Sequence, residues 1–539
     1  MKNAWIVLAA ASAVVLGVYA VAVHSGMMES LTADPADTYY NLQVRGFRVG
    51  QLNVKRDVPP GLAQLADPYD PVANTPYRST IYGVHDLSYY KGRLYLYFGV
   101  TPAVILFWPY AVLTDHYLFH RQAVLIFCAI GLLASIGLLR GLWRRYFPEV
   151  NAGVVAMCAL TLGLATSVPL FLSGADFYQV PISCGYMLTM LALGAIWCAM
   201  HEPEPRKRSG WLAAASVAYG LAVGARPSLL FGAVILLVPV AETWRDRRQF
   251  WMALLAAIGP IILIGLGLML YNYQRFGNAF EFGQRYQLSG ERQITQQFFS
   301  LQYFWFNFRV YFLEPVRWGS RFPFVQGITL PPVPVGHGTV EGPFGVLTNV
   351  PVVWLALAVP LVWRRRLAEA GILRRFITVV ALFFGICALS LCLFRGANAR
   401  YELEFLPALV WLAVAGILGV ESALADRPAW RRAARLGWGL LLVFSVAFGL
   451  LSAIQHHAEM DNNFGIVMGR AGRMQEAIEH FEDAVRIEPG YAEAHYNLGL
   501  ALEHAGRLQD AANQYEQALR IEPGLIEAQF ALTRLHAVR

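Results

Sequence analysis

Long apolar runs alternate with short polar segments along most of the chain. The first run, Ala4 to Val23, follows Lys2 and is long enough for a transmembrane helix, which needs about 20 apolar residues. Its end lacks the small-residue cleavage site of a signal peptide, so we expect a retained first crossing. Ten further runs predict crossings at about 120–142, 150–170, 179–200, 211–225, 227–241, 250–272, 346–363, 376–394, 403–421 and 436–455.

Groups of arginine separate these runs and predict their orientation, because cytoplasmic loops carry an excess of Arg and Lys. If every group lies in the cytosol, the run 94–113 must dip into the outer face without crossing. Eleven crossings result, with the N-terminus in the cytosol and the C-terminus outside. Two long outer segments then cover about 24–119 and 273–345. The two halves of 211–241 are short for crossings, and one long helix is the alternative there.

Composition indicates a membrane protein and excludes several other classes. Of the 539 residues, 56% are hydrophobic and 15% are charged, whereas a soluble domain carries about 25% charged residues. Residues 461–539 hold seven Arg against twelve acidic residues, so the basic excess belongs to the membrane part, where loop arginines set orientation. That excess therefore indicates no nucleic-acid partner. All six cysteines lie in apolar runs, where they resemble small buried hydrophobes rather than a zinc or disulfide framework.

The polar segment 461–539 repeats with a period of 34 residues. Ala471-Gly472-Arg473 recurs as Ala505-Gly506-Arg507, and Glu488-Pro489-Gly490 recurs as Glu522-Pro523-Gly524. Small residues allow paired helices to pack closely, and Pro ends each unit because it cannot continue the helix. The pattern resembles tetratricopeptide repeats, with two repeats and a closing helix at 525–538. Such repeats imply a small soluble α-solenoid that binds a protein partner or serves dimerisation or stability.

The first outer segment opens with the signature of a helix start. Asp34 before Pro35 fits an N-cap residue followed by proline at the first helical position. Asp37 then lies in the first turn. An apolar stripe follows at helical spacing: Tyr40, Val44 and Phe47. We therefore expect an amphipathic helix on the outer membrane face, with Asp37 near its beginning.

Three later segments complete a family pattern. They are His85 to Ala103 (HDLSYYKGRLYLYFGVTPA), Tyr271 to Tyr286 (YNYQRFG followed by GQRY) and Arg400 to Pro407 (RYELEFLP). Together with the Asp37 segment they resemble the GT-C glycosyltransferases, multi-pass enzymes that use polyprenyl-phosphate-linked sugars. The chain is also similar to protein mannosyltransferases of the dolichyl-phosphate-mannose type that carry tetratricopeptide repeats. The resemblance implies an all-α polytopic membrane domain at 1–455 followed by the repeat domain at 461–539.

The resemblance also implies roles for two acidic residues. Asp37 would act as general base on the acceptor hydroxyl, which attacks the anomeric carbon with inversion while the lipid phosphate leaves. Proton transfer of this kind requires the carboxylate to reach the nucleophile. Asp34, one helical turn away, is the alternative base. Helix-start electrostatics explain both residues without catalysis, and they explain Asp34 better.

Arginine is expected to bind the leaving phosphate, because its guanidinium offers paired donors. Arg226 lies between two apolar runs, where a charged residue is usually functional. Arg400 is the second candidate, and an ion pair with Glu402 or Glu404 is its structural alternative. For Arg226 the alternative is a side chain that reaches the lipid headgroups. Further outward-facing candidates are Arg275, Arg285 and Arg395.

Metal binding is a weaker expectation. His85 and Asp86 can ligate a divalent ion, as in some GT-C enzymes, but two neighbouring residues fall short of a full ligand set. The resemblance also implies that Asp176, on a short outer loop, contacts ligand or metal. Outer tyrosines can stack on sugar or anchor at the interface: Tyr39, Tyr89, Tyr90, Tyr95 and Tyr97. No Gly-rich phosphate loop follows a predicted strand, which fits a lipid-linked donor.

We therefore expect a glycosyltransferase of the bacterial inner membrane with its repeat domain in the periplasm. Its partners would be a polyprenyl-phosphate sugar, an acceptor protein or glycan, membrane lipids and a protein bound by the repeats. One alternative is an O-antigen polymerase or ligase, whose catalytic residues lie in a large later loop; here that loop holds Arg309, Arg317, Arg321 and His337. The other is a non-catalytic membrane scaffold, which would depend on the repeats and not on Asp37.

Overall fold

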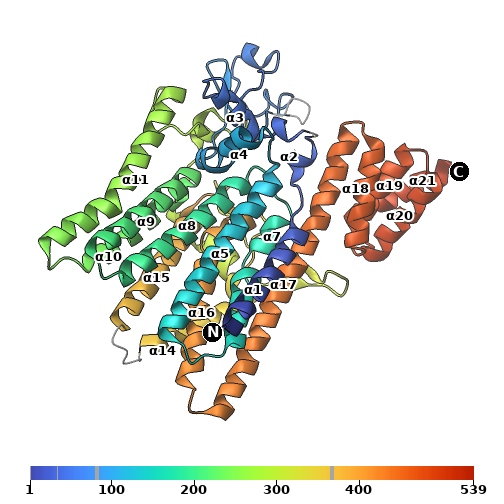
Figure 1. The fold of residues 1–539 in the computed structure, drawn as a ribbon. Helices are drawn as coiled ribbons and strands as arrows, with labels where there is room; N and C mark the ends of the chain where they lie inside the picture. The colour runs from blue at the N-terminus through green and yellow to red at the C-terminus, as the bar shows by residue number, and fades with distance from the viewer. Residues whose placement is uncertain (1, 33, 79–83, 364–369, 539) are drawn as a thin grey trace.

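Helices form nearly all of the regular structure. The computed structural model describes residues 2–32, 34–78, 84–363 and 370–538, and Figure 1 shows a bundle of helices with a smaller helical group beside one end. The described strands form three short pairs: β1 (Ser88–Tyr90) with β2 (Arg93–Tyr95), β3 (Val316–Trp318) with β4 (Val325–Ile328), and β5 (Val340–Glu341) with β6 (Ala397–Asn398). The all-α class predicted from the sequence is confirmed.

The bundle contains the apolar runs. It consists of α1 (Lys2–Ala22), α5 (His120–Tyr146), α6 (Ala152–Leu164), α7 (Val168–Leu172), α8 (Gln179–His201), α9 (Pro205–Ala225), η4 (Pro227–Leu236), α10 (Leu237–Ala241), α11 (Arg247–Phe276), α13 (Val346–Asn349), η9 (Pro351–Ala358), α14 (Val359–Trp363), α15 (Ala370–Leu393), α16 (Leu406–Ala423) and α17 (Pro428–Arg470). Six of the described helices, namely α5, α8, α11, α15, α16 and α17, are long and apolar enough to cross a membrane. The chain is a multi-pass membrane protein.

The region 211–241 is divided at Arg226. Helix α9 ends at Ala225, and Pro227 begins the 3-10 segment η4. Because Pro lacks an N–H and restricts the residue before it, the chain leaves the helix at this point. The alternative of one long helix is therefore wrong, and Arg226 lies at the break.

One end of the bundle carries the long polar segments, and we name it the loop face. Its N-terminal part contains α2 (Met27–Ser30), η1 (Pro35–Asp37), α3 (Tyr39–Arg48), η2 (Leu62–Gln64), η3 (Ala103–Phe107) and α4 (Trp108–Thr114). Its second part contains η5 (Gln284–Tyr286), η6 (Gln293–Thr295), η7 (Leu301–Tyr303), α12 (Phe304–Phe308) and η8 (Arg309–Leu313). The helical part of 94–113 therefore has the 12 residues Ala103–Thr114, fewer than the about 20 that a crossing needs.

Helix α3 differs from the amphipathic surface helix that its stripe predicts. Asp34 caps the separate 3-10 turn η1, and α3 begins only at Tyr39. Most of α3 is buried, including the polar residue Gln43. The ring of Tyr40 stacks on Phe107 of η3 at 5.2 Å, and Gln43 Nε2 donates to Tyr271 Oη of α11 at 2.9 Å. Other outer segments thus enclose the helix that was expected on the membrane surface.

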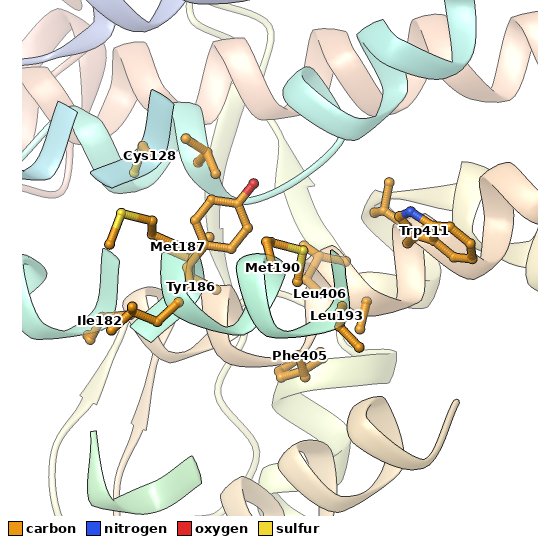
Figure 2. Close-up of a cluster of buried hydrophobic side chains, with 14 of the residues drawn as sticks. Cys128, Ile182, Tyr186, Met187, Met190, Leu193, Phe405, Leu406 and Trp411 are labelled. Carbon is orange, nitrogen blue, oxygen red and sulfur yellow. The ribbon is translucent and has the colours of Figure 1, made fainter. Parts of the chain in front are cut away.

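A dense apolar core lies between α5, α8 and α16. Figure 2 shows Tyr186, Met187, Met190 and Leu193 of α8 near Cys128 of α5, and Leu406 and Trp411 of α16. Trp411 and Leu406 are at most 2% exposed, as is Phe405, which directly precedes α16. Burial of such side chains contributes about 1.5–3 kcal/mol each. This core fixes the start of α16 and therefore the short helix η10 (Ala399–Glu404) before it.

The C-terminal helices form a repeat arm, which we define as α18 (Met474–Ile487), α19 (Ala492–His504), α20 (Leu508–Ile521) and α21 (Ile526–Val538). The arm lies beside the upper part of α17 (Figure 1). Gly465 and Gly499 occupy equivalent positions, where an added Cβ would lie 2.5 Å from the rings of Phe481 and Tyr515. Small residues are thus required where the paired helices cross. Helix α17 continues without a break through the predicted boundary between 455 and 461.

Candidate functional site

The predicted motifs meet on the loop face through backbone hydrogen bonds. The N–H of Asp86 donates to Leu288 O at 3.0 Å, and the N–H of Leu288 donates to Leu87 O at 2.9 Å. Ser88 Oγ donates to Gly283 O at 2.8 Å. The segment after α11 is thereby attached to the segment that begins at His85. The first outer segment joins them, since Tyr39 Oη donates to His85 O at 2.6 Å.

Asp86 lies at the centre of this contact. Its carboxylate accepts a hydrogen bond from Tyr178 Oη, and His85 Nε2 lies 3.7 Å from Asp86 Oδ2. Burial raises the pKa of Tyr178, and Asp86 raises it further. The phenol therefore remains a hydrogen-bond donor to Asp86. The backbone of Asp86 has a φ of 58°, in the left-handed region that Asp tolerates better than most residues.

Arg400 lies on the other side of Tyr178. Its Cζ is 4.7 Å from the centre of the Tyr178 ring and 5.6 Å from that of Tyr401. Arg400 Nη1 also pairs with Glu341 Oε2 at 2.9 Å, and the Glu341 side chain is 50% exposed. Burial alone would lower the pKa of Arg400, but Tyr401, Glu341 and Tyr178 together raise it. The guanidinium therefore carries its positive charge at all physiological pH values.

Arg226 reaches the same place from the break between α9 and η4. Its Nε donates to Glu404 Oε1 at 2.7 Å, and its Cζ lies 5.2 Å from the centre of the Tyr401 ring. Ser228 Oγ donates to the second oxygen of Glu404 at 2.9 Å. Both predicted arginines therefore lie against Tyr401. We name this group the polar cluster and define it by these residues: Asp86, Tyr178, Arg226, Arg400, Tyr401 and Glu404.

A glycine allows the second motif to approach Arg226. A Cβ added to Gly99 would lie 2.3 Å from the carbonyl oxygens of both Gly224 and Ala225. These oxygens belong to the last turn of α9, directly before Arg226. Only a residue without a side chain fits at this distance, so Gly99 fixes the spacing between the loop face and the arginine.

The two predicted bases lie apart from the polar cluster. Asp34 Oδ1 accepts from the N–H of Ala36 at 2.8 Å, which is the contact of an N-cap. Asp37 pairs with Arg45 Nη1 of α3 at 2.8 Å, and its side chain is 56% exposed. Within the described residues, Asp37 forms no hydrogen bond or ion pair with either Arg226 or Arg400. The structure therefore joins His85, Asp86 and the two arginines, and leaves both bases outside this group.

The expected metal site at His85 and Asp86 has no third ligand among the described residues. His85 and Asp86 are adjacent to each other, but no group of three His, Cys, Asp or Glu in the described part of the chain is arranged to hold an ion. Structural zinc sites use four protein ligands and catalytic ones three. The described residues therefore do not fit a resident metal.

A second buried polar group consists of Glu29, His120 and Asp176. Of these three residues, the sequence analysis identifies only Asp176. His120 Nδ1 lies 3.8 Å from Asp176 Oδ1 and 3.9 Å from Glu29 Oε2, and all three residues are at most 5% exposed. Burial raises the pKa of Glu29, which His120 opposes. Asp176 is followed directly by Phe177 and Tyr178, so this group supports the segment that contacts Asp86. Glu29 and His120 show no sequence signal, because their partners are distant along the chain.

The other arginine candidates have structural partners. Arg275 Nη1 donates to Leu96 O at 2.8 Å, and Arg395 Nη2 pairs with Glu291 at 2.6 Å. In the later loop, Arg309 pairs with Glu314, and His337 Nε2 lies 3.0 Å from Asn307 Oδ1. These contacts hold the loops of the loop face together.

Comparisons with known proteins cover both parts of the chain. Residues 464–526 match the tetratricopeptide repeat family model, which confirms the predicted repeats. No curated protein matches the chain. The chain is similar to the oligosaccharyltransferase of Archaeoglobus fulgidus in its apo form, at 11% identity and a TM-score of 0.47, covering 85% of this chain and 56% of that one.

It is also similar to ArnT from Cupriavidus metallidurans. The apo structure aligns at 14% identity and a TM-score of 0.45, and covers 91% of this chain and 80% of that one. The structure bound to undecaprenyl phosphate aligns at 15% identity and a TM-score of 0.41, and covers 96% and 80%. The family of the C-terminal repeats is thus established by a family model, and that match does not extend to the helix bundle.

Proposed function

We propose that this chain is a GT-C-type membrane glycosyltransferase. It transfers a sugar from a polyprenyl-phosphate donor to an acceptor protein or glycan at the loop face. The observation that carries the proposal is the convergence of Arg226 and Arg400 on Tyr401. In this proposal the lipid headgroups lie at the same end of the bundle. In this proposal the chain resides in a bacterial inner membrane, with its N-terminus in the cytosol and its repeat arm in the periplasm.

The two arginines would bind the donor phosphate unequally. Arg226 pairs with Glu404, whose side chain is 4% exposed, whereas Arg400 pairs with Glu341, whose side chain is 50% exposed. An exposed ion pair exchanges partners at little cost, and a buried one does not. The phosphate would therefore replace Glu341 on Arg400. Arg226 would keep Glu404 and supply the remaining donors.

The reaction would proceed by direct displacement. The acceptor hydroxyl attacks the anomeric carbon, a new C–O bond forms, and the bond between that carbon and the phosphate oxygen breaks. The leaving phosphate takes the electron pair and is stabilised by Arg226 and Arg400, since fixed positive charge acts where negative charge develops. Asp37 accepts the proton of the hydroxyl. Its exposed carboxylate is open to an acceptor, which would have to displace Arg45 to reach it.

The test uses the purified chain in lipid nanodiscs with a panel of radiolabelled polyprenyl-phosphate sugars and membrane extract as acceptor. The variants are Asp37→Asn, Asp86→Asn and, as a matched control, Asp115→Asn. Asp115 is also an exposed aspartate paired with an arginine of α3, Arg48, at 3.4 Å. We expect transfer by the wild type and by Asp115→Asn, and loss of transfer in Asp37→Asn.

Each other outcome has a definite meaning. Transfer retained by Asp37→Asn but lost in Asp86→Asn would move the base into the polar cluster and overturn the role of Asp37. Failure of the folded wild type to use any donor would overturn the proposed function itself. Folding is checked by gel filtration and circular dichroism of each variant.

A further inference from the structure

Two histidines stack where the loop face meets the helix that carries the repeat arm. His24 follows α1, and its ring lies on that of His457 in α17, with centres 3.6 Å apart and planes inclined by 24°. Both rings are half-buried and lie beyond the apolar runs that end at Val23 and about 455. A stacked pair of imidazoles is stable when both rings are neutral, because two charged rings at this distance repel each other.

A carboxylate connects this pair to the repeat arm. Asp461 of α17 is 8% exposed. Its Oδ2 lies 3.5 Å from His457 Nε2, and its Oδ1 lies 3.2 Å from Nδ1 of His480, which belongs to α18. Asp461 therefore links the stacked rings to His480 in the first helix of the arm.

On the opposite side, His24 is attached to the segment that supports the polar cluster. Its N–H donates to Leu172 O at 3.0 Å, and its carbonyl accepts from the N–H of Ala175 at 2.9 Å. Leu31, shortly after His24, packs against the apolar core of the arm. The segment 24–31 thus lies between the bundle and the arm (Figure 1), and the histidine stack closes the contact.

The charged groups around the rings act in different directions. Burial lowers the pKa of His24, Asp461 opposes this, and Arg121 of α5 adds to it. Burial and His24 lower the pKa of His457, and His456 lowers it too, while Asp461 and Asp483 raise it. The hydrogen bond from Asp461 raises the pKa of His480, and Asp483 and Glu476 raise it further. His456 itself lies 3.7 Å from Glu459.

We propose that the His24–His457 stack is an acid-sensitive contact, and that protonation of both rings releases the repeat arm from the loop face. The inference is independent of the proposed function. The proposal rests on the ring geometry and on the position of His24 between bundle and arm. It also rests on a difference between the histidines: His457 and His480 each lie within 4 Å of a carboxylate oxygen, and among the described residues His24 has no such partner.

The difference in histidine pKa between the docked and released states determines how docking stability changes with pH. A histidine whose pKa is lower in the docked state stabilises docking at high pH, and this contribution is lost as pH falls below its ordinary value of about 6.5. This holds for His24 and His457. His480 behaves oppositely, since its raised pKa strengthens the contact with Asp461 in acid. Helices α17 and α18 therefore stay together while the contact with His24 opens.

The experiment measures the position of the arm by double electron–electron resonance in nanodiscs at pH 7.5 and 5.0. Spin labels are attached to cysteines at Val72 of the loop face and Phe530 of α21, which are 82% and 72% exposed. The parent protein, with its native cysteines alone, controls for background labelling. We expect a reversible shift to longer and broader distances at pH 5.0.

The double variant His24→Phe/His457→Phe keeps two aromatic rings that cannot be protonated, and we expect it to lose the shift. His495→Gln, a histidine of α19 outside the stack, is the matched control and should keep it. An unchanged distance in the wild type between the two pH values overturns the proposal. A shift that persists in the double variant also overturns it, because another group would then be responsible. If the double variant does not assemble, His24→Phe alone serves, since one neutral ring removes the repulsion.

Discussion

The polar cluster and the repeat arm both contain ion pairs, but the paired residues differ in sequence separation and in exposure. In the cluster, Arg226 pairs with Glu404 across 178 residues of sequence, and both side chains are less than 20% exposed. In the arm, Arg473 pairs with Glu476 and Arg507 with Asp510, three residues apart and about half exposed. These two arm pairs are local contacts at the starts of α18 and α20, whereas the cluster pair holds two distant segments in one place.

This difference predicts unequal costs when a pair is broken. An exposed pair contributes about 0–1 kcal/mol, because water replaces the lost partner. Removal of one partner from a buried pair costs about 3–5 kcal/mol, because the remaining charge has no solvent. Four substitutions probe the difference between the two regions, two in or beside the cluster and two in the arm.

Arg226→Ala is expected to destabilise the bundle most, by about 3–5 kcal/mol, because it leaves Glu404 buried without a counter-charge. The measurement is the free energy of unfolding in mixed detergent micelles, with transfer activity as a second readout. Arg226→Ala/Glu404→Gln should recover a large part of the stability but not the activity. Equal stability of the single and double variants would show that Glu404 does not depend on Arg226.

Gly99→Ala is expected to cost about 1–3 kcal/mol through overpacking, because the carbonyl oxygens that the new Cβ meets belong to the backbone and cannot rotate away. Thermal unfolding of the solubilised protein measures the effect. Gly137→Ala in α5 is the matched control, since nothing lies within 4 Å of its added Cβ. Wild-type stability of Gly99→Ala would mean that the loop face can move away from α9.

Glu488→Gln is expected to stabilise the arm at alkaline pH. Burial and the nearby Glu459 raise the pKa of Glu488 to about 7. A raised carboxyl pKa means that the folded state loses stability as pH rises towards and through 7. Because the group is partly exposed, the gain at pH 8 is about 1–2 kcal/mol, and it shrinks as pH falls to 5. Thermal melts of the full chain across this range measure it, and a gain that does not change with pH would contradict the assignment.

Arg507→Ala is expected to have the smallest effect, at most about 0.5 kcal/mol, because the pair with Asp510 is exposed on one helix. The same thermal melt is used, at low and high salt. A loss of more than about 1 kcal/mol would remove the distinction between the two kinds of pair.

The two regions also differ in how far the sequence predicts them. The repeats follow from local spacing, and the glycines at 465 and 499 lie where the 34-residue period requires small residues. The helical class and the apolar runs are predicted for the same reason. For 211–241 the sequence allows either a break at Arg226 or one long helix, because periodicity alone does not show whether a helix continues past a Pro.

The cluster is predicted only in part. Sequence motifs predict functional roles for Arg226, Arg400 and Asp86. They suggest Glu404 as a partner of Arg400, whereas in the structure Glu404 pairs with Arg226. Tyr178 and Glu341 were not identified, because each depends on contacts between residues far apart in the chain. The apolar stripe predicts that one face of α3 is buried, but it does not predict that other outer segments cover most of the helix, because periodicity does not identify the covering elements.

The unbroken helix α17 determines how the arm faces the helix bundle. Its 43 residues extend about 65 Å at 1.5 Å per residue and join the last apolar run directly to the repeats. The rotation of the arm about the axis of α17 therefore depends on the number of helical residues between the apolar run and the repeats. One inserted residue between His457 and the apolar run would rotate the arm by about 100°, whereas seven would return it to within about 20° and raise it by about 10 Å. While the arm is docked, the direction in which the repeats present their surface is thus set by the number of residues in α17.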